Sequence, residues 1–258
     1  MNLSCRLIGA LVLLTTTLGV PGAAAEIEKG FNSMFNGKDL SGWEGLPGAW
    51  QVVGGAIVAE STPEKPCKQA HYLMWRGGKP GDFELRLDFR LEGVGGNSGI
   101  QFRSRELANW DTSGYQADIE YGDQWTGCLF EHTRGGVAMR GEKVAIDKDG
   151  KKSVSAVAAP EKVQRLMADK ASGGEGLSLS AALLKQVKMG EWNSYTIVAR
   201  GPEISLKIND VVMCQVKDQQ AGVAARDGVI ALQMHPGPPM KISFKNLRIK
   251  SADSRPAQ

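Results

Sequence analysis

Cysteine is scarce in this chain of 258 residues, and no Cys-x-x-Cys spacing occurs. This absence excludes the sequence patterns of a zinc ribbon and of a thioredoxin-like redox centre. Cys5 lies in the N-terminal leader described below, so Cys67, Cys128 and Cys214 remain in the rest of the chain. We expect buried free thiols, with a disulfide between Cys67 and either of the others as the open alternative.

Several sequence signatures of nucleotide, nucleic-acid and hydrolase chemistry are also missing. The glycine-rich segment 93–97 joins two expected strands, whereas a phosphate-binding loop joins a strand to a helix. There is no Gly-x-Ser-x-Gly elbow and no basic stripe. The net charge is +3, and removal of the leader with its one cation, Arg6, leaves about +2. This near balance indicates no nucleic-acid partner.

Long apolar runs are missing after residue 25, while the first 25 residues have the features of a secretion signal. Arg6 precedes an apolar stretch at 7–20, and small residues at 21–25 provide an Ala-x-Ala cleavage site. The apolar stretch is too short, and too interrupted by threonine, for a membrane span. We therefore expect a bacterial protein that is periplasmic or secreted, with no membrane segment in its mature form.

The dominant pattern in the remaining residues is an alternation of apolar and polar side chains with a period of two. It is regular over 83–92 and recurs over 195–199, 204–208 and 242–250. Such strands bury one face and expose the other. Together with 32 glycines, the pattern predicts an all-β protein, and more than ten candidate strands favour two packed sheets over a small closed barrel.

The domain organisation follows from the same pattern. We predict a signal peptide at 1–25, a single sandwich domain at 26–250 and a flexible tail at 251–258. Within the domain, residues 147–189 lack the alternation and are rich in Lys, Ser, Gly and Ala. We interpret them as an excursion from the sheets, with a short helix between Pro160 and Lys170.

Polar residues occupy one side of the expected strand 114–121. Gln116, Asp118 and Glu120 alternate with apolar neighbours, so all three should point to the same side of the sheet. A core-forming face would not carry three adjacent polar positions. The strand therefore predicts a polar sheet face that holds a ligand.

Two other expected strands repeat this arrangement. Gln101 and Arg103 share the parity of one strand, and Gln233 and His235 that of another. If these strands are neighbours, their polar side chains form one charged face. Arg103 could instead form a structural salt bridge with Asp118, and His235 could simply end its strand before a turn.

Five segments resemble the 3-keto-disaccharide hydrolase family, whose fold is like that of concanavalin A-type lectins and glucanases. In order they read FNGKDLSGW at 35–43, NSGIQFRS at 97–104, GYQADI at 114–119, GEWNSYTI at 190–197 and GVIALQMH at 228–235, the last continuing to FKNLRIK at 244–250. The resemblance spans about residues 31–250. It implies an antiparallel jelly-roll sandwich, a sugar substrate, and export from glycan-degrading bacteria, often beside sugar oxidoreductases.

The resemblance also implies a reaction, in which a ketone at C3 of the sugar makes the C2 proton acidic. A base removes that proton, the enolate expels the glycosidic oxygen from C1, and water then adds. Asp118, Glu120 and Glu131 are the base or acid candidates, and Glu131 stands where a similar family segment carries an acid. Arg103 and His235 suit the enolate oxygen or a sugar hydroxyl.

Recognition of the sugar is expected from amide and aromatic side chains. Gln101, Gln116 and Gln233 suit hydroxyl groups, while Trp110 and Trp125 lie in polar loops where an indole could stack on a sugar ring. We interpret His132, which is less typical of the family segment, as a surface or structural residue.

Three alternatives stay open at this point. Direct hydrolysis would use two carboxylates, for which Asp118 and Glu131 are the candidate pair. A catalytic divalent metal could draw on these two residues together with His132 and His235, and a structural calcium would fit the lectin-like fold. A non-catalytic carbohydrate-binding module could use the same sandwich, although the ionisable side chains favour an enzyme.

Overall fold

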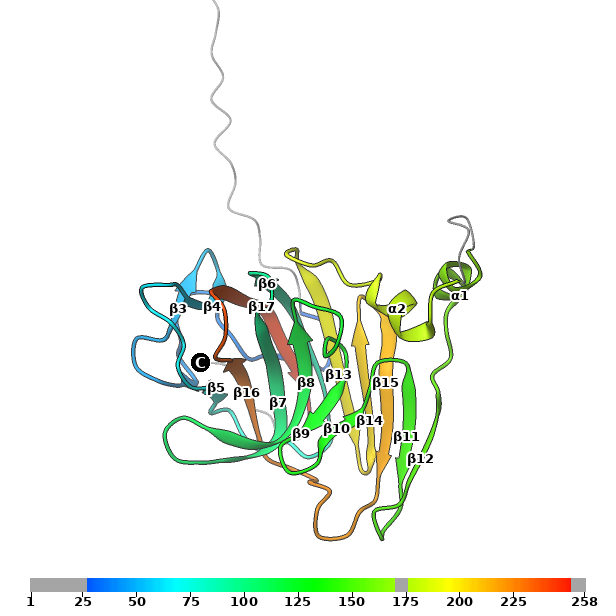
Figure 1. Ribbon diagram of the computed structural model, residues 1–258. Coiled ribbons are helices and arrows are strands. Elements are labelled where there is room, and N and C mark those ends of the chain that lie inside the picture. Colours follow the sequence, from blue (N-terminus) through cyan, green and yellow to red (C-terminus); the bar gives the residue numbers. More distant parts are fainter. Residues whose placement is uncertain (1–26, 170–175, 252–258) are drawn as a thin grey trace, which may run out of the picture.

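Strand formation follows the alternating pattern most clearly in β6 (Phe83–Glu92), where every second side chain is buried. The computed structural model describes residues 27–169 and 176–251. The predicted leader therefore lies outside the described residues, as does the predicted tail except for its first residue. Strands dominate the described chain, and the two helices are short (Figure 1).

The larger sheet has ten strands, which run across Figure 1 from β12 on the right to β3 on the left. Its order is β12 (Lys152–Ala156), β11 (Glu142–Ile146), β15 (Val211–Asp218), β14 (Glu203–Ile208), β13 (Asn193–Arg200), β6, β17 (Met240–Lys250), β4 (Ala56–Ser61) and β3 (Trp50–Val53), with β1 (Asn32–Ser33) paired to β17. The pairing of β11 with β15 is parallel, and the other pairings in this sheet are antiparallel.

The smaller sheet has seven strands and is antiparallel throughout. Its order is β10 (Gly135–Ala138), β9 (Leu129–Glu131), β8 (Thr112–Glu120), β7 (Asn97–Glu106), β16 (Val229–Met234), β5 (His71–Trp75) and β2 (Trp43–Glu44). The predicted all-β, two-sheet jelly-roll sandwich is confirmed. The three polar strands are neighbours, in the order β8, β7 and β16.

The core lies between the two sheets. Phe83 and Phe89 from the larger sheet and Phe102 and Leu232 from the smaller one are buried there. The rings of Phe83 and Phe102 meet edge to face, with centroids 6.0 Å apart. Burying each such side chain contributes about 1.5–3 kcal/mol. Side chains of opposite parity point outward, and this is what gives the smaller sheet its polar outer face.

A β-bulge interrupts the alternation in β7. The register with β8 shifts between Phe102 and Arg105, and Arg103 lies in the left-handed region with φ +47°. On the neighbouring strand the register shifts at Val229, next to Gly228. A Cβ on Gly228 would lie 2.5 Å from the backbone nitrogen of Ser104, so only glycine fits this close approach.

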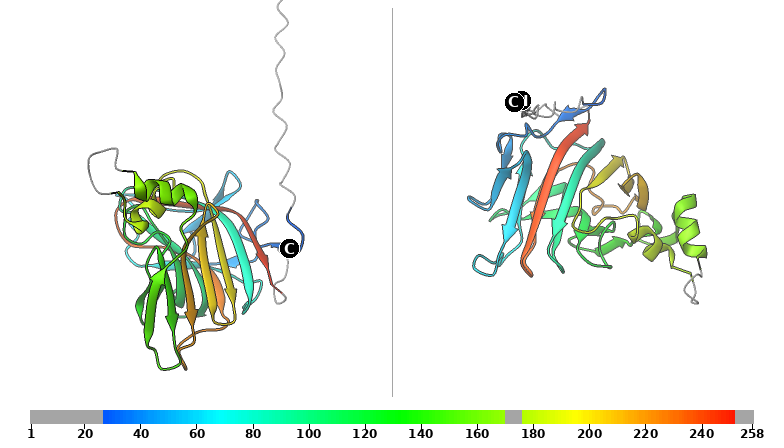
Figure 2. Two further views of the ribbon diagram at one scale, coloured as in Figure 1. Left: turned by 90° about the vertical axis from the view of Figure 1, so that its right-hand side faces the viewer. Right: turned by 90° about the horizontal axis from the view of Figure 1, so that it is seen from above.

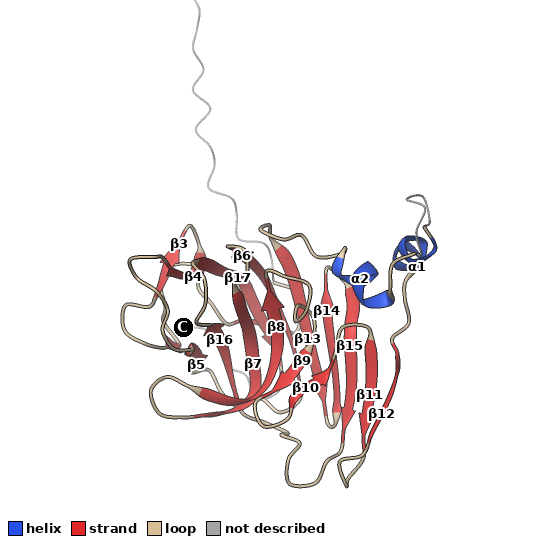
Figure 3. Cartoon of the chain, in the orientation of Figure 1, coloured by secondary structure: helices blue, strands red, loops and turns tan. Residues whose placement is uncertain are grey.

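The two helices lie at the edge of the sandwich, on the side away from β17 and β4 (Figures 2 and 3). The helix predicted near residues 160–170 is confirmed as α1 (Glu161–Ala168). A second helix, α2 (Leu179–Leu184), begins after Ser178, whose side chain accepts a hydrogen bond from the Ala181 N–H. In the described chain neither helix is long and apolar enough to cross a membrane.

Candidate functional site

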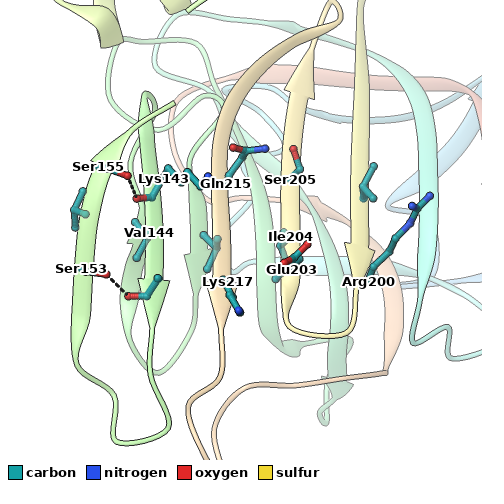
Figure 4. A pocket seen from close by; sticks show the side chains of 14 residues that line it. Lys143, Val144, Ser153, Ser155, Arg200, Glu203, Ile204, Ser205, Gln215 and Lys217 are labelled. Atoms are coloured by element: carbon teal, nitrogen blue, oxygen red, sulfur yellow. Dashed lines mark hydrogen bonds between the residues drawn. The ribbon is translucent and has the colours of Figure 1, made fainter. Parts of the chain in front are cut away.

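Two sheet faces carry hollows that could hold a ligand. One, of about 520 Å³, lies on the outward side of the larger sheet over β11 to β13 (Figure 4). Among the described residues that line it there is no aromatic side chain or histidine, and Glu203 is the one carboxylate. Ser153 and Ser155 donate to the backbone oxygens of Ala145 and Lys143. This hollow offers few groups for catalysis.

The second hollow, here called the site pocket, has a volume of about 400 Å³ and opens on the outward face of the smaller sheet. Five of the predicted site residues line it: Gln116, Asp118, Trp125, Gln233 and His235. Ala70, Tyr72, Asn97, Asp111, Phe130 and His132 complete the lining. Its size and its mixture of aromatic and polar groups are typical of small-molecule sites.

A chain of hydrogen-bonded amides crosses the pocket from strand to strand. Gln101 donates through Nε2 to Gln116 Oε1 at 2.8 Å, and its own Oε1 accepts the Ser104 hydroxyl at 2.7 Å. Gln116 Nε2 donates to Gln233 Oε1 at 3.1 Å and to Asp118 Oδ1 at 2.5 Å. Because each buried amide is held by its neighbours, their orientations are defined before any ligand binds.

This amide chain ends at a buried phenol. Gln233 Nε2 donates to the Tyr72 hydroxyl at 2.9 Å, and the same hydroxyl lies 3.3 Å from His132 Nε2. Burial raises the pKa of Tyr72 to about 12, so the phenol stays neutral at physiological pH and keeps a proton to donate. Tyr72 is therefore a hydrogen-bond donor placed at the pocket wall.

Asp118 is the most perturbed ionisable group of the pocket. The residue is 3% exposed, and this burial, with a smaller contribution from the charge of Glu120, raises its pKa to about 8 despite the stabilising hydrogen bond from Gln116. The carboxyl is thus mostly protonated at pH 7 and can donate a proton. A raised carboxyl pKa in a pocket is a common property of catalytic acids.

His235 follows the end of β16, and its tautomer is defined by the backbone. Nδ1 lies 2.6 Å from the carbonyl oxygen of Pro236. A carbonyl oxygen only accepts, so Nδ1 carries the proton and, in the neutral ring, Nε2 holds the lone pair. The predicted site residue therefore has a nitrogen that can accept a proton.

Glu120 does not line the pocket but holds the turn that carries Trp125 into it. Glu120 Oε2 accepts the backbone N–H groups of Gln124 at 3.1 Å and of Trp125 at 2.7 Å. The Glu120 N–H donates to Thr126 Oγ1, and the Thr126 hydroxyl donates to the Glu120 carbonyl oxygen, both at 2.7 Å. Trp125 then meets Phe130 edge to face, with ring centroids 6.0 Å apart.

The placement predicted for Arg103 is wrong. The bulge turns this side chain inward beside Phe102, where its guanidinium donates to the carbonyl oxygens of Gly81 at 2.9 Å and Gly201 at 2.8 Å. Its ion-pair partner is Asp82, at 3.2 Å, rather than Asp118. Arg103 joins the loops at one end of the sandwich and does not reach the site pocket.

The placement predicted for Glu131 is also wrong. In the pairing of β8 with β9, Phe130 stands opposite Gln116, so Phe130 and His132 face the pocket and Glu131 points between the sheets. There Glu131 Oε2 forms an ion pair with Arg134 Nε at 3.0 Å. The two-carboxylate pair of Asp118 and Glu131 is therefore not assembled.

Sequence reasoning undervalued His132 and missed Tyr72, Asn97, Asp111 and Phe130. The parity of Phe130 and His132 becomes visible only from the pairing of β9 with β8. Tyr72 lies in a strand of mainly apolar residues and packs with the buried Met74 and Ala231, so no local pattern marks it as a site residue.

The thiols and the predicted metal ligands can be placed as well. All three cysteines in the described residues are free, with Cys128 and Cys214 buried and Cys67 half-buried. No group of three or more His, Cys, Asp and Glu side chains in the described chain is close enough to hold a metal ion. Because Glu131 points away from His235 and Asp118, the proposed ligand set does not fit a metal.

Jelly-roll sandwiches of this kind are common among sugar-binding lectin domains, and a polar, aromatic-edged pocket on one sheet fits that class. A family model described as a 3-keto-alpha-glucoside-1,2-lyase-like domain matches residues 30–250. The chain belongs to this family, and the resemblance to 3-keto-disaccharide hydrolases is confirmed.

Two solved structures illustrate the likeness in fold. A Parabacteroides distasonis protein provisionally described as a glycosyl hydrolase is 19% identical, with a TM-score of 0.50 over 86% of this chain and 98% of that one. The carbohydrate-binding module CBM66 from Bacillus subtilis is 14% identical, with a TM-score of 0.50 over 83% of this chain and 98% of the module. No curated protein matches the sequence.

Proposed function

We propose that the protein cleaves the glycosidic bond of 3-keto glycosides, including 3-keto disaccharides, in the site pocket. The observation that carries this proposal is the buried Asp118 carboxyl, with its pKa raised to about 8, in one pocket with His235 and the amide chain. Membership of a family described as 3-keto-alpha-glucoside-1,2-lyase-like supports the class of substrate.

The proposed reaction begins with removal of the C2 proton by His235 Nε2, the nitrogen that holds the lone pair. The electrons of the C2–H bond form the enolate of the C3 ketone. As the enolate collapses, a C1–C2 double bond forms, the C1–O bond breaks and the leaving oxygen takes the proton of Asp118. Water then adds across the double bond: the ionised Asp118 takes one of its protons as the hydroxyl bonds to C1, and His235 returns its proton to C2, so both groups regain their starting states. The net result is hydrolysis.

The neutral phenol of Tyr72 takes the role that the sequence suggested for Arg103. Charge develops on the C3 oxygen in the transition state, and a hydrogen-bond donor that is already held in place stabilises it. Gln116 and Gln233 bind sugar hydroxyls, and Gln101 holds the Gln116 amide in position through its hydrogen bond. Trp125 and Phe130 supply the apolar surface for a sugar ring.

A single acidic carboxyl with a separate base suits elimination better than direct hydrolysis. Direct hydrolysis calls for two carboxyls on either side of the bond, and Glu131 lies on the other side of the sheet. Asp111, the other carboxylate of the pocket lining, accepts the N–H of Thr112 at 2.7 Å. Its remaining acceptor positions suit a sugar hydroxyl.

We further propose that the protein is exported to the periplasm or secreted, as the leader at residues 1–25 suggests. A 3-keto sugar must be produced by oxidation of a sugar hydroxyl. The protein would therefore act after a sugar oxidoreductase.

The second candidate function is carbohydrate binding without catalysis. The likeness in fold to the module CBM66 and the preorganised amide chain favour it. It differs from the first candidate in one respect, because a binding module would not need the proton of Asp118.

Product release from 3-keto disaccharides and from their unoxidised parents tests the proposal. We expect cleavage of the keto sugars alone, with loss of activity in Asp118→Asn and in His235→Ala. Asp210→Asn, in an exposed turn of another hairpin, is the matched control and should behave like the wild type. Binding of sugars without any cleavage would replace the enzyme proposal by the binding module.

A further inference from the structure

The hollow on the outward side of the larger sheet, here called the outer hollow, has an excess of positive charge (Figure 4). Lys143, Arg200 and Lys217 line it, and Glu203 is the one carboxylate among its described lining residues. All four side chains belong to exposed residues. Three cations against one carboxylate leave an excess of two positive charges, which is large for one hollow in a protein whose charges are nearly balanced.

These cations have no ionic partner within the part of the chain that the structure describes. No ion pair in residues 27–169 and 176–251 includes Lys143, Arg200 or Lys217. Glu203 stands opposite Arg200 on β13 and opposite Lys217 on β15, yet it is absent from these ion pairs as well. The three cationic groups are therefore available to a ligand.

The neighbouring strand β6 does not neutralise this charge. Its Glu84 stands opposite Val198, which lines the outer hollow. However, Glu84 Oε1 pairs with Arg86 Nη2 at 2.5 Å, within the same strand. The outer hollow therefore suits an anionic ligand, because ammonium and guanidinium groups form their strongest hydrogen bonds with anionic oxygens.

The outer hollow is long enough for a chain molecule. Its lining residues form two rows across five neighbouring strands, from β12 to β13, with Lys217 and Arg200 in one row and Lys143 in the other. Neighbouring strands lie about 4.8 Å apart, so a row across five strands is about 19 Å long. A single small anion would occupy only one end of it.

The groups between the cations indicate which kind of chain fits. Gln215 provides an amide, and Ser153 and Ser155 provide hydroxyl oxygens, which suit the hydroxyl groups of a sugar. No aromatic side chain is among the described residues that line the outer hollow, so it lacks the stacking surfaces on which proteins bind single-stranded nucleic acids. Positive charge combined with small polar groups favours a glycan that carries negative charges.

We propose that the outer hollow binds an acidic polysaccharide, a glycan chain with carboxylate groups. The three cations bind carboxylates of the chain, and Gln215 and the two serines bind its hydroxyls. The site pocket opens on the outward face of the smaller sheet, so the two surfaces lie on opposite sides of the sandwich. The protein would thus be retained on the polysaccharide with its site pocket open. This inference concerns binding alone and does not depend on the proposed reaction.

Calorimetric titration with polygalacturonate at low salt tests the proposal. Its methyl ester, which has the same backbone without the charges, is the matched ligand and should bind far more weakly. In the double variant Lys143→Gln with Lys217→Gln, the Kd for polygalacturonate should rise about 10-fold, since each exposed charge contact changes affinity a few-fold. Added salt should weaken binding to the wild type, because exposed charges are screened.

The control is the double variant Lys38→Gln with Lys162→Gln, which loses the same charge. Both residues are exposed and neither lines the outer hollow, so this variant should bind polygalacturonate like the wild type. Equal weakening in the two double variants would show that net charge alone matters, and would overturn the site. Thermal unfolding confirms that each variant is folded.

Three further results would overturn the proposal. They are a wild type that does not bind polygalacturonate, equal affinity for the methyl ester, and tighter binding to duplex DNA or to vesicles of anionic phospholipid. The last result would mean that the outer hollow takes a polyanion of another class. The titration requires no turnover, so its outcome is separate from that of the cleavage assay with 3-keto sugars.

Discussion

A buried carboxyl lies on each side of β8, and the two carboxyls have opposite electrostatic surroundings. On the inner side, Asp218 accepts the Tyr115 hydroxyl at 2.5 Å and pairs with Arg134 at 2.7 Å. On the outer side, Asp118 receives a side-chain hydrogen bond from the neutral amide of Gln116. Both carboxyls are almost fully buried, and the inner one has a cation within reach.

This difference separates a carboxyl that stabilises the fold from one that is available for proton transfer. A buried charge is tolerated when a cation and hydrogen bonds replace the water it loses. The inner cluster of Tyr115, Glu131, Arg134 and Asp218 meets that condition and joins the two sheets. Asp118 is held by amides instead, so burial raises its pKa and leaves a proton that can be transferred. Four variants would break or sharpen the contrast.

Replacing the outer carboxyl should have the largest effect. In Asp118→Asn we expect kcat for 3-keto disaccharides to fall about 10²–10⁴-fold, because the proton donor is lost while shape and hydrogen bonding change little. Steady-state kinetics with the keto sugars measures the change. Wild-type activity in this variant would show that Asp118 is not the acid.

Replacing the inner carboxyl should affect stability instead. Asp218→Asn removes the ion pair with Arg134 and should cost about 3 kcal/mol of unfolding free energy, measured by urea denaturation. The folded fraction should keep wild-type activity because Asp218 does not line the site pocket. A loss of activity without a loss of stability would contradict the division between the two sides.

A substitution in the close packing beneath the amide chain should have a smaller effect on activity. A Cβ on Gly99 would lie 2.6 Å from Gln116 Cγ, so Gly99→Ala should displace that amide and raise KM roughly 10-fold, the cost of one misplaced hydrogen-bonding group. The double variant Gly99→Ala with Gln116→Ala removes the clash. It also removes the hydrogen bonds that Gln116 makes to its buried neighbours, so KM should stay high, and recovery of the wild-type KM would show that Gln116 does not bind the substrate.

The effect of Asp118→Asn on the free energy of unfolding should depend on pH and should be smallest at low pH. The folded-state pKa of Asp118 lies near 8, above the ordinary value of about 3.9. Above pH 4 the unfolded chain releases this proton while the folded protein keeps it, so ionisation lowers stability progressively up to pH 8. Asp118→Asn removes this loss and should be more stable than the wild type at pH 8.

At about pH 3, below both pKa values, the carboxyl is largely protonated in both states, so the stability difference between Asp118→Asn and the wild type should shrink toward zero. Thermal unfolding across this range provides the measurement. A difference that does not depend on pH would mean that Asp118 is not a buried acid with a raised pKa.

Much of the site was accessible from sequence. Gln116 and Asp118 share a face because alternation along one strand is a local property of the backbone. Alternation along its own strand places Gln233 in the same way, and all three residues line the site pocket. The sequence left the adjacency of the three polar strands as a condition, and the sheet order β8, β7, β16 meets it.

Two errors have a common cause. Alternation places Gln101 and Arg103 on one face only if the strand is regular, and the bulge after Phe102 breaks that rule. For Glu131 and His132, the strand is too short for its sequence to show which side chains face the pocket. Which of two neighbours faces the pocket is settled by pairing with β8, and the chain in this region carries no local signal for it.

The sequence by itself determined the fold class, the strand content and the polar side of β8, because these follow from the order of residues along one segment. The tertiary structure decided which polar groups meet. It turned Arg103 and Glu131 inward and brought Tyr72 and His132 into one pocket with Asp118. The physical reason is that register, bulges and burial depend on partner strands that are distant in the chain.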